Sequence, residues 1–288
     1  MTTLLATLAR AYLTHFPIER GKWRIWSMLY GRLRQVRFPA GLYTLKHGLA
    51  MHLDPEQYID QHCYYWGSWE PDETRVVVRL LRPGDTVVDV GANAGYFTLL
   101  AANLVGPTGR VFAFEPVPPT IEKLERNVAA SATSCVTICP YAAAGARSAV
   151  KISRRGVGHV SGQNTMRPDA NADDFWTVDT VRIDDLVPAD APVRLIKLDA
   201  EGAELLALQG ATAILRGKDG PYLLCEVTDA YLRELGGSAQ ALWDLLGEHG
   251  YRHIYDCHRG RLTPVPSSSL TSESQLNVLF SKLPVDWR

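Results

Sequence analysis

The segment from Thr86 to Thr98 is the first part of the chain whose residue types suggest chemistry. Its sequence, TVVDVGANAGYFT, has the pattern of a buried strand, a turn of small residues and a helix start. Gly91 and Gly95 would let the backbone approach a ligand where no side chain fits, and the helix N-terminus offers free N–H groups. The GxxxG spacing differs from the GxGxxG of pyrophosphate-binding turns. The segment therefore predicts a cradle for a smaller cofactor without phosphates.

A carboxylate follows the next predicted strand along the chain. Residues 110–114, RVFAF, are followed directly by Glu115. An acid at the carboxyl edge of the strand beside the glycine turn can accept hydrogen bonds from two ribose hydroxyls. This position suits a nucleoside cofactor, and by itself it fits an NAD site as well.

The segment IKLDAEGAE, residues 196–204, ends the fourth predicted parallel strand. Lys197 and Asp199 point to the same side of that strand, and Asp199 and Glu201 flank its exit, where open α/β sheets hold their ligands. One lysine and three acids on an apolar strand cost desolvation energy, which favours a functional role. A purely structural ion pair between Lys197 and a neighbouring acid remains the alternative.

The elements that must position these residues alternate between strand and helix. Such alternation predicts an α/β, Rossmann-like domain with a mostly parallel sheet of seven strands and helices on both faces. A helix at 71–81 should cover the sheet, and an insertion at 148–183 interrupts the pattern. Strands are predicted at 86–90, 110–115, 135–139, 193–198, 222–227, 251–256 and 276–281, and helices at 95–105, 118–130, 203–215 and 238–249.

The first 37 residues form a basic arm. They hold seven Lys or Arg and one acid, whereas the whole chain has a net charge of −1. Apolar spacings of three and four predict two amphipathic helices, which either touch an anionic membrane or a partner, or dock on their own domain with a solvated basic face. We divide the chain into an arm and cap, residues 1–68, and a catalytic domain, residues 69–288. A homo-oligomer is left open.

Composition narrows the class and the compartment. The near-neutral charge argues against a general nucleic-acid-binding protein. Five cysteines without a CxxC pair argue against a disulfide framework and a zinc site. Arg10 interrupts the early apolar stretch, and no membrane span or secretory leader is predicted. A cytoplasmic protein fits these features best.

Together, the motifs resemble the FkbM family of S-adenosylmethionine (SAM)-dependent methyltransferases. The resemblance rests on DVGANAGYFT, FEPVP, the IDDL of residues 183–186, IKLDAEGAE and the late NVLF, in this order from about Gly67 to Phe280. It implies a class I methyltransferase fold and an acceptor hydroxyl on a sugar, glycolipid or natural product. It also implies that Lys197, Asp199 and Glu201 border the acceptor. The implied SAM contacts are Asp89, Gly91, Asn93, Gly95 and Glu115.

A hydroxyl acceptor must lose its proton, so the site needs a base. Our candidates are Asp199 and Glu201, followed by Glu226 at the end of the fifth strand and His159 in the insertion. Glu70 could reach the methionine end of SAM, or could serve at a helix start or on the surface. We assign the adjacent acids Asp184 and Asp185 to turn and surface hydrogen bonding, and predict no required metal.

Three competing interpretations share these features. An NAD-dependent oxidoreductase would use the same fold and Glu115, but it would need a third glycine near Phe97 or Thr98. An N-methyltransferase often carries an Asn/Asp-Pro-Pro-aromatic turn after the fourth strand, where this chain has Asp199-Ala200-Glu201-Gly202. A non-enzymatic module would bind a partner through the basic arm.

Overall fold

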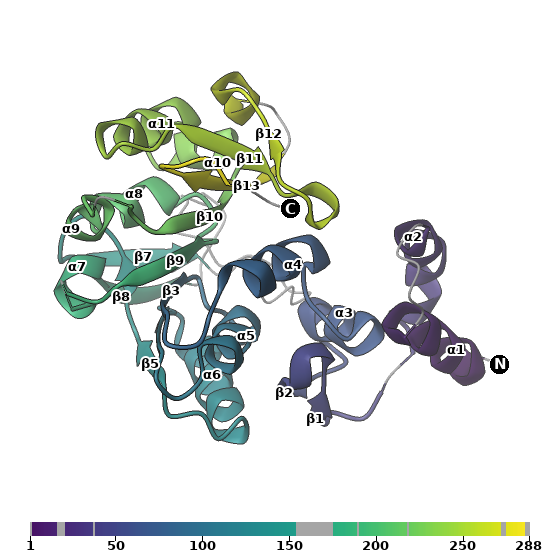
Figure 1. Ribbon diagram of the computed structural model, residues 1–288. Helices are drawn as coiled ribbons and strands as arrows, with labels where there is room; N and C mark the ends of the chain where they lie inside the picture. Colours follow the sequence, from purple (N-terminus) through teal and green to yellow (C-terminus); the bar gives the residue numbers. More distant parts are fainter. Residues whose placement is uncertain are drawn as a thin grey trace.

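A large mixed sheet forms the centre of the molecule (Figure 1). The computed structural model describes residues 2–15, 21–36, 38–153, 175–188, 190–217, 219–271 and 275–285. In spatial order the strands are β12 (Thr263–Pro264), β11 (His253–Asp256), β13 (Leu276–Ser281), β10 (Tyr222–Val227), β9 (Val193–Leu198), β3 (Thr86–Val90), β4 (Arg110–Phe114) and β5 (Val136–Cys139).

Five strands of this sheet, β5, β4, β3, β9 and β10, run parallel to one another. The other three, β13, β11 and β12, each pair antiparallel with their neighbours. The prediction of a mostly parallel Rossmann-like sheet is confirmed, but the sheet has eight strands and not seven. The additional strand, β12, contains only two residues, too few to show a periodic pattern. Its Pro264 lacks a backbone N–H and is suited to an edge.

Helices cover both faces of the sheet, as expected for a doubly wound domain (Figure 1). On one face, α4 (Pro71–Leu80) and α5 (Tyr96–Val105) pack on a core that includes Val87 and Leu195. On the other face, α8 (Glu204–Gln209) and α11 (Ala239–Glu248) pack on Val88 and Ile196. The remaining helices of the domain are α6 (Pro118–Ala130), α7 (Ile183–Leu186), α9 (Thr212–Leu215), α10 (Asp229–Glu234), η2 (His258–Gly260) and η3 (Ser267–Thr271).

The helix predicted at 203–215 is in fact two helices, α8 and α9. The chain turns between them at Gly210, where an added Cβ would lie 2.2 Å from the carbonyl oxygen of Ala144. This close approach to another segment of the chain breaks the helix, and the periodicity of the sequence does not reveal it.

The register of the central strands places the polar residues on one face. Asp89 of β3 lies beside Lys197 of β9, and Lys197 lies beside Leu224 of β10. Because side chains alternate along a strand, Glu226 shares the face of Leu224. Asp89, Lys197 and Glu226 therefore all point toward the α4 and α5 layer, near the carboxyl ends of parallel strands.

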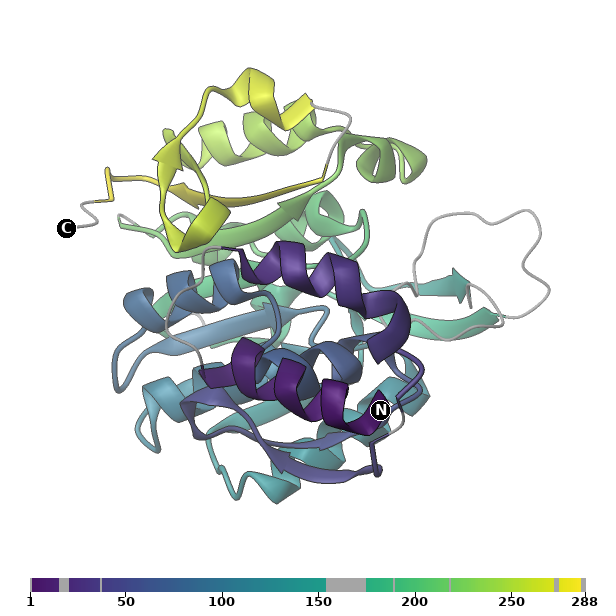
Figure 2. The same cartoon turned by 90° about the vertical axis from the view of Figure 1, so that its right-hand side faces the viewer.

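The N-terminal arm and cap pack against the domain. They comprise α1 (Thr2–His15), α2 (Lys22–Leu33), β1 (Gly41–Thr44), η1 (Lys46–Gly48), β2 (Ala50–Leu53) and α3 (Tyr58–Trp66). Figure 2 shows α1 and α2 lying across one side of the molecule. The arm docks through a cluster of buried apolar side chains: Ala6, Ala9, Leu13, Trp26, Leu33, Tyr65 and Trp66.

Two basic residues of the arm make contacts within the protein. Arg10 donates to the carbonyl of Tyr64 at 3.0 Å, and the buried Lys22 donates to that of Leu13 at 3.0 Å. The two predicted helices of the arm are present, whereas α3 was not predicted. The arm thus packs mainly on α3 of the cap. The boundary between residues 68 and 69 stays a prediction.

The predicted insertion, residues 148–183, contributes two strands to a small separate sheet, and the third strand precedes it. The strands of this sheet are β6 (Ala142–Ala143), β7 (Ala149–Ser153) and β8 (Phe175–Val181). His159 and the glycines around it lie outside the described residues. All five cysteines are free. Within the described ranges, none of the helices has the length and apolar character needed to cross a membrane.

Candidate active site

The turn between β3 and α5 wraps closely around the ends of neighbouring strands. The N–H groups of Gly91 and Ala92 both donate to the carbonyl of Phe114 at 3.0 Å. An added Cβ on Gly91 would lie 1.9 Å from the carbonyl oxygen of Asp199, and its φ is 79°. Glycine is therefore required here by packing against the exit of β9, which brings the turn and Asp199 together.

Gly95 has a different place from the other predicted cofactor contacts. It is the N-cap of α5 with φ 93°, and an added Cβ would lie 2.6 Å from Cδ1 of Leu124. Gly95 does not line either of the two cavities described below. Its structural role is to let α5 pack on α6, and its predicted contact with the cofactor stays a prediction.

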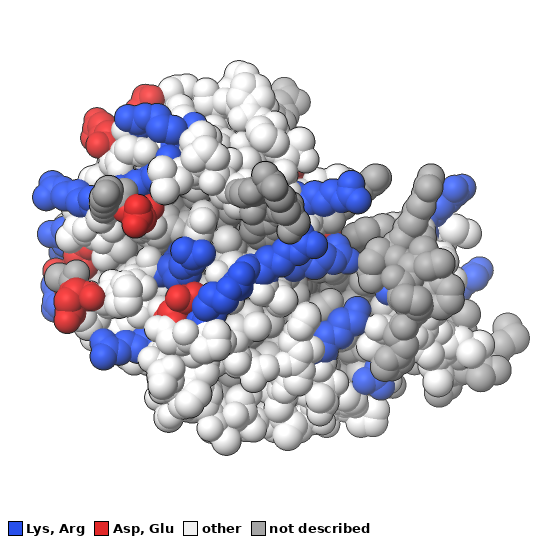
Figure 3. All heavy atoms as spheres, in the orientation of Figure 1, with Lys and Arg blue, Asp and Glu red and all other residues white. Residues whose placement is uncertain are grey.

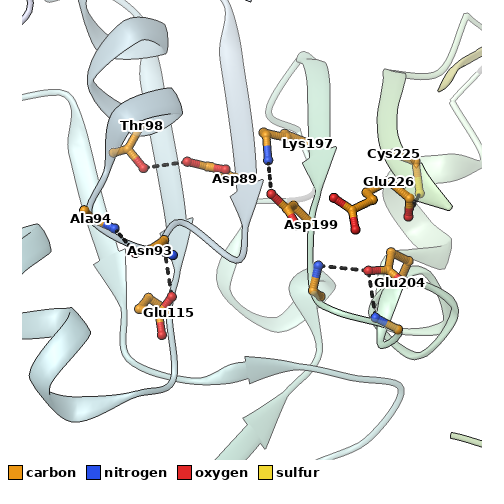
Figure 4. A network of polar contacts seen from close by, with 12 residues as sticks. Asp89, Asn93, Ala94, Thr98, Glu115, Lys197, Asp199, Glu204, Cys225 and Glu226 are labelled. Carbon is orange, nitrogen blue, oxygen red and sulfur yellow. Dashed lines mark hydrogen bonds and ion pairs between the residues drawn. The ribbon is translucent and has the colours of Figure 1, made fainter. Parts of the chain in front are cut away.

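Glu115 is buried at the end of β4 and is held by the backbone (Figure 4). One carboxylate oxygen accepts from the N–H of Asn93 at 3.0 Å, and the other accepts from the N–H of Val117 at 2.9 Å. Burial raises the pKa of Glu115 to about 7, against the lowering effect of these two hydrogen bonds. The carboxyl group borders a small cavity of about 80 Å³ that Gly91, Asn93 and Glu201 also line.

Lys197 lies among acids at the end of β9 (Figure 4). Its ammonium is 2.9 Å from Asp199 and 4.5 Å from the centre of the Phe97 ring. Burial alone would lower the pKa of Lys197, but the charges of Asp199, Glu70 and Asp89 outweigh it and raise that pKa. The predicted ion pair exists, and it faces a cavity.

Asp89 has one satisfied and one unsatisfied oxygen. Thr98 donates to Oδ2 at 2.6 Å, whereas the buried Oδ1 has no hydrogen-bond partner among the described residues. Burial raises the pKa of Asp89, and the charge of Lys197 opposes this shift. An acceptor oxygen left without a donor at the edge of a cavity is suited to a ligand that carries an N–H group or a positive charge.

Two further acids reach the same place from other elements. Glu70 precedes α4 with a left-handed φ of 39°, and Glu226 comes from β10. One carboxylate oxygen from each of Glu70, Asp199 and Glu226 lies within 4.8 Å of the others. Burial raises the pKa of Glu70 to about 8, while burial together with the charges of Asp199 and Glu70 raises that of Glu226 to about 10.

The side chain of Glu204 stabilises the turn that carries Asp199 and Glu201. This buried carboxylate accepts from the N–H groups of Ala200 at 2.9 Å and Gly202 at 3.1 Å. Gly202 has φ 103°, and an added Cβ would lie 2.8 Å from the carbonyl oxygen of Tyr231. Glu204 is thus a structural support for the two predicted acceptor-side acids.

All of these acids except Glu115 and Glu204 line a larger cavity of about 840 Å³. Aromatic side chains form another wall, including Tyr58, His62 and Trp69. His62 stacks on Trp66 with ring centres 5.4 Å apart, and burial lowers its pKa to about 4. The ring of Trp26 in the arm lies 5.2 Å from His62.

The structure brings most of the residues predicted for the site to one cavity, while their roles stay predictions. Glu70, Asp89, Gly91, Asn93, Lys197, Asp199 and Glu201 all line the larger cavity. Four residues, Gly91, Asn93, Asp199 and Glu201, line both cavities, which therefore adjoin each other. The aromatic wall was not predicted, although the density of aromatic residues between Tyr58 and Trp69 was a usable signal.

The acids Asp184 and Asp185 are remote from these cavities. Asp184 accepts from the N–H groups of Ala213 and Ile214 at the start of α9. Asp185 lies 3.4 Å from Arg147. The predicted surface role fits Asp185, whereas Asp184 is mostly buried in α7 and holds the start of α9 from a distant part of the chain.

A family comparison favours a methyltransferase over the oxidoreductase and the non-enzymatic module. The model of the methyltransferase FkbM domain matches residues 89–253, which include the glycine turn, Glu115 and the Lys197–Glu201 segment. The chain belongs to the FkbM methyltransferase family. The cofactor of this FkbM methyltransferase domain is SAM, and the fold is that of class I methyltransferases.

Curated relatives support this assignment. The chain is 40% identical over 95 residues to the 31-O-demethyl-FK506 methyltransferase FkbM of Streptomyces tacrolimicus, covering 32% of each chain. It is 27% identical over 158 residues to the hexuronic acid methyltransferase AglP of Haloferax volcanii, covering 51% of this chain and 58% of that one. The chain spans less than two thirds of the length of the curated relatives it matches.

A solved structure of a SAM-dependent O-methyltransferase from Thermotoga maritima is also similar to the FkbM methyltransferase domain. It matches with 16% identity and a TM-score of 0.42, covering 76% of this chain and 68% of that one.

The residues of the site fit SAM. The unpartnered oxygen of Asp89 and the surrounding carboxylates suit a ligand with an ammonium and a sulfonium group. Glu115 presents a carboxylate at a small cavity beside the glycine turn. Among the described residues that line the two cavities, Lys197 is the only Lys or Arg, and it is already paired with Asp199, so a pyrophosphate would meet little positive charge here.

Proposed function

We propose that this domain transfers the methyl group of SAM to a hydroxyl oxygen of a small-molecule or carbohydrate acceptor. The observation that supports this best is the meeting of the two cavities at Asp199 and Glu201. One cavity has the ribose-type acceptor Glu115, and the other has space for an acceptor beside carboxylates and aromatic rings. No nucleic-acid acceptor is proposed.

Different residues would bind the cofactor and orient the reacting groups. Glu115 would accept hydrogen bonds from ribose hydroxyls, and Asp89 would face the ammonium group of the methionine part. SAM supplies a methyl group on a sulfonium that is already a good leaving group. The chain must therefore mainly align the acceptor oxygen and exclude water. Lys197 holds and orients Asp199, and Glu204 holds the backbone that carries it.

A base is needed because a neutral hydroxyl attacks poorly while it keeps its proton. Asp199 is our first candidate, and Glu201 and Glu226 stand beside it on the same cavity wall. The aromatic wall of Tyr58, His62 and Trp69 would hold the apolar faces of the acceptor. His62 stays neutral at physiological pH because burial lowers its pKa to about 4.

Two measurements test this function. Calorimetry should show that the protein binds SAM and its product S-adenosylhomocysteine (SAH), but not NAD. Transfer of label from methyl-labelled SAM should then be measured on paired acceptors that differ only in a hydroxyl or an amino group, with Asp199→Asn as the inactive control. Tight NAD binding without SAM binding, or methylation of the amine alone, would overturn the proposal.

The basic arm is proposed as a secondary contact surface. Its buried face packs on α3, while Met28 on α2 is 74% exposed one turn from the exposed Arg24 and Arg32, and Leu8 on α1 is 59% exposed. This combination supports weak binding to an anionic membrane. Vesicles of phosphatidylglycerol should retain the protein more than vesicles of phosphatidylcholine, and equal retention would refute the proposal.

A further inference from the structure

The larger cavity is lined by several acids, and one of the three that cluster there, Asp199, is paired with a basic side chain. Glu70, Asp199 and Glu226 bring one oxygen each within 4.8 Å, and Lys197 bonds only to Asp199. Among the described residues that line this cavity, Lys197 is the only Lys or Arg. Three carboxylates at this spacing cannot all be ionised cheaply beside a single ammonium.

Other groups around the three acids increase the negative charge. Asp89 adds a buried carboxylate with an unpartnered oxygen, which is a second and independent sign that a cation belongs here. Arg75, the nearest basic residue on α4, is bonded to Asp72 at 2.8 Å. The remaining titratable groups that line this cavity or act on the three acids, among the described residues, are Glu73 on α4, Glu201 and Glu204 after β9, Tyr58 and His62 on α3, Tyr96 on α5, Tyr231 on α10, and Asp256 and His258 near η2.

The acids are not part of a generally acidic surface. In Figure 3, Lys and Arg side chains run across the middle of the visible face, over the region of α4, and few acids are seen there. Arg79 on α4 and Arg82 just after it are exposed. The negative charge is therefore concentrated inside the cavity, where screening by solvent is weaker.

We propose that Glu70 and Glu226, which lie beside the Asp199–Lys197 ion pair, hold at least one proton between them in the cofactor-free protein and release it to solvent when the sulfonium cation of SAM binds. This inference rests on the proposed function, because it assumes that SAM occupies the two adjoining cavities. The step breaks one carboxyl O–H bond, the proton passes to a buffer base, and a carboxylate remains in the protein. Raised pKa values of Glu70 and Glu226 support the shared proton.

The consequence for catalysis is that cofactor binding frees a second proton acceptor beside Asp199, the first candidate base. Before SAM binds, the acid group beside Asp199 carries a proton and cannot take another from the acceptor. After SAM binds, the carboxylate formed on Glu226 or Glu70 faces the acceptor space. This second acceptor for the hydroxyl proton would be available only when a methyl group is present to replace that proton.

The test compares SAM with SAH, which lacks the methyl group and the sulfonium charge. Calorimetric titrations at pH 8 in phosphate and in Tris give the number of protons released, because the two buffers differ in ionisation enthalpy. For a group that is half protonated near this pH, SAM should release on the order of half a proton more than SAH. In Glu226→Gln and in Glu70→Gln this difference should shrink, whereas Glu125→Gln, an exposed acid on α6, should keep it.

Each outcome decides a different point. If SAM and SAH bind but release equal numbers of protons, the shared proton is refuted while the proposed function stands. If the difference persists in both Gln variants, the proton comes from other groups and the assignment to these acids is wrong. If neither nucleoside binds, the proposed function and this inference fail together.

Discussion

Replacing Glu226 by Gln should make the cofactor-free protein more stable at alkaline pH. The pKa of Glu226 is raised from 4.5 to about 10, so between these values the folded protein binds more protons than the unfolded chain. The free energy of unfolding therefore falls as pH rises from about 4.5 towards 10. Gln cannot ionise, and the variant should lack this part of the decline.

The size of the effect follows from the pKa shift. If the whole shift acted, the Glu226 carboxyl group would lower the free energy of unfolding at pH 9 by about 6 kcal/mol, at about 1.4 kcal/mol for each pH unit above 4.5. The Glu226 side chain is only partly buried, and its charge can be shared with Glu70 through the proton between them. The actual loss of free energy of unfolding at pH 9 is therefore smaller. We expect the variant to gain about 2 kcal/mol over the wild type at pH 9 and less than about 0.5 kcal/mol at pH 5.

Urea denaturation at pH 5, 7 and 9, followed by tryptophan fluorescence, measures this difference. Glu125→Gln is the matched control, because it removes an exposed acid from α6 and should change nothing with pH. A constant difference between Glu226→Gln and the wild type across this range would refute the reasoning. A variant that is less stable at pH 9 would show that the Glu226 carboxylate is stabilised by its surroundings.

Further predictions concern other parts of the site. Glu115→Gln should weaken SAH binding by about 10- to 100-fold in calorimetry, since the charged acceptor is lost; unchanged affinity would exclude Glu115 from the cofactor site. Gly91→Ala should lower the free energy of unfolding by about 3 kcal/mol in urea titrations, because its Cβ would meet the Asp199 carbonyl; wild-type stability would contradict that packing role. Trp26→Ala should lower the free energy of unfolding by about 3 kcal/mol and raise the pKa of His62, measured by NMR, from about 4; an unchanged pKa would show that the arm does not help to bury His62. Treatment with EDTA should leave SAH affinity and methyl transfer unchanged, and a loss restored by Mg²⁺ would disprove the predicted absence of a required metal.

Local sequence determined the elements that carry the cofactor side of the site. The strand, glycine turn and helix from Thr86 to Val105 follow from residue types within one short segment, as does Glu115 at the end of the next strand. Lys197 and Asp199 pair because residues two apart on a strand share a face. These features depend on neighbours in sequence, so periodicity and turn chemistry were sufficient to predict them.

Only the tertiary structure decided which side chains lie beside Asp199. Glu70 and Glu226 come from segments far apart in the sequence, and sheet order and register bring them to the same cavity. The aromatic wall depends on how α3 and the arm dock, and the break between α8 and α9 depends on the approach of Ala144. The physical reason is common to all of them: burial and charge act through space, and their effect on a carboxyl group is set by neighbours that the sequence does not place beside it.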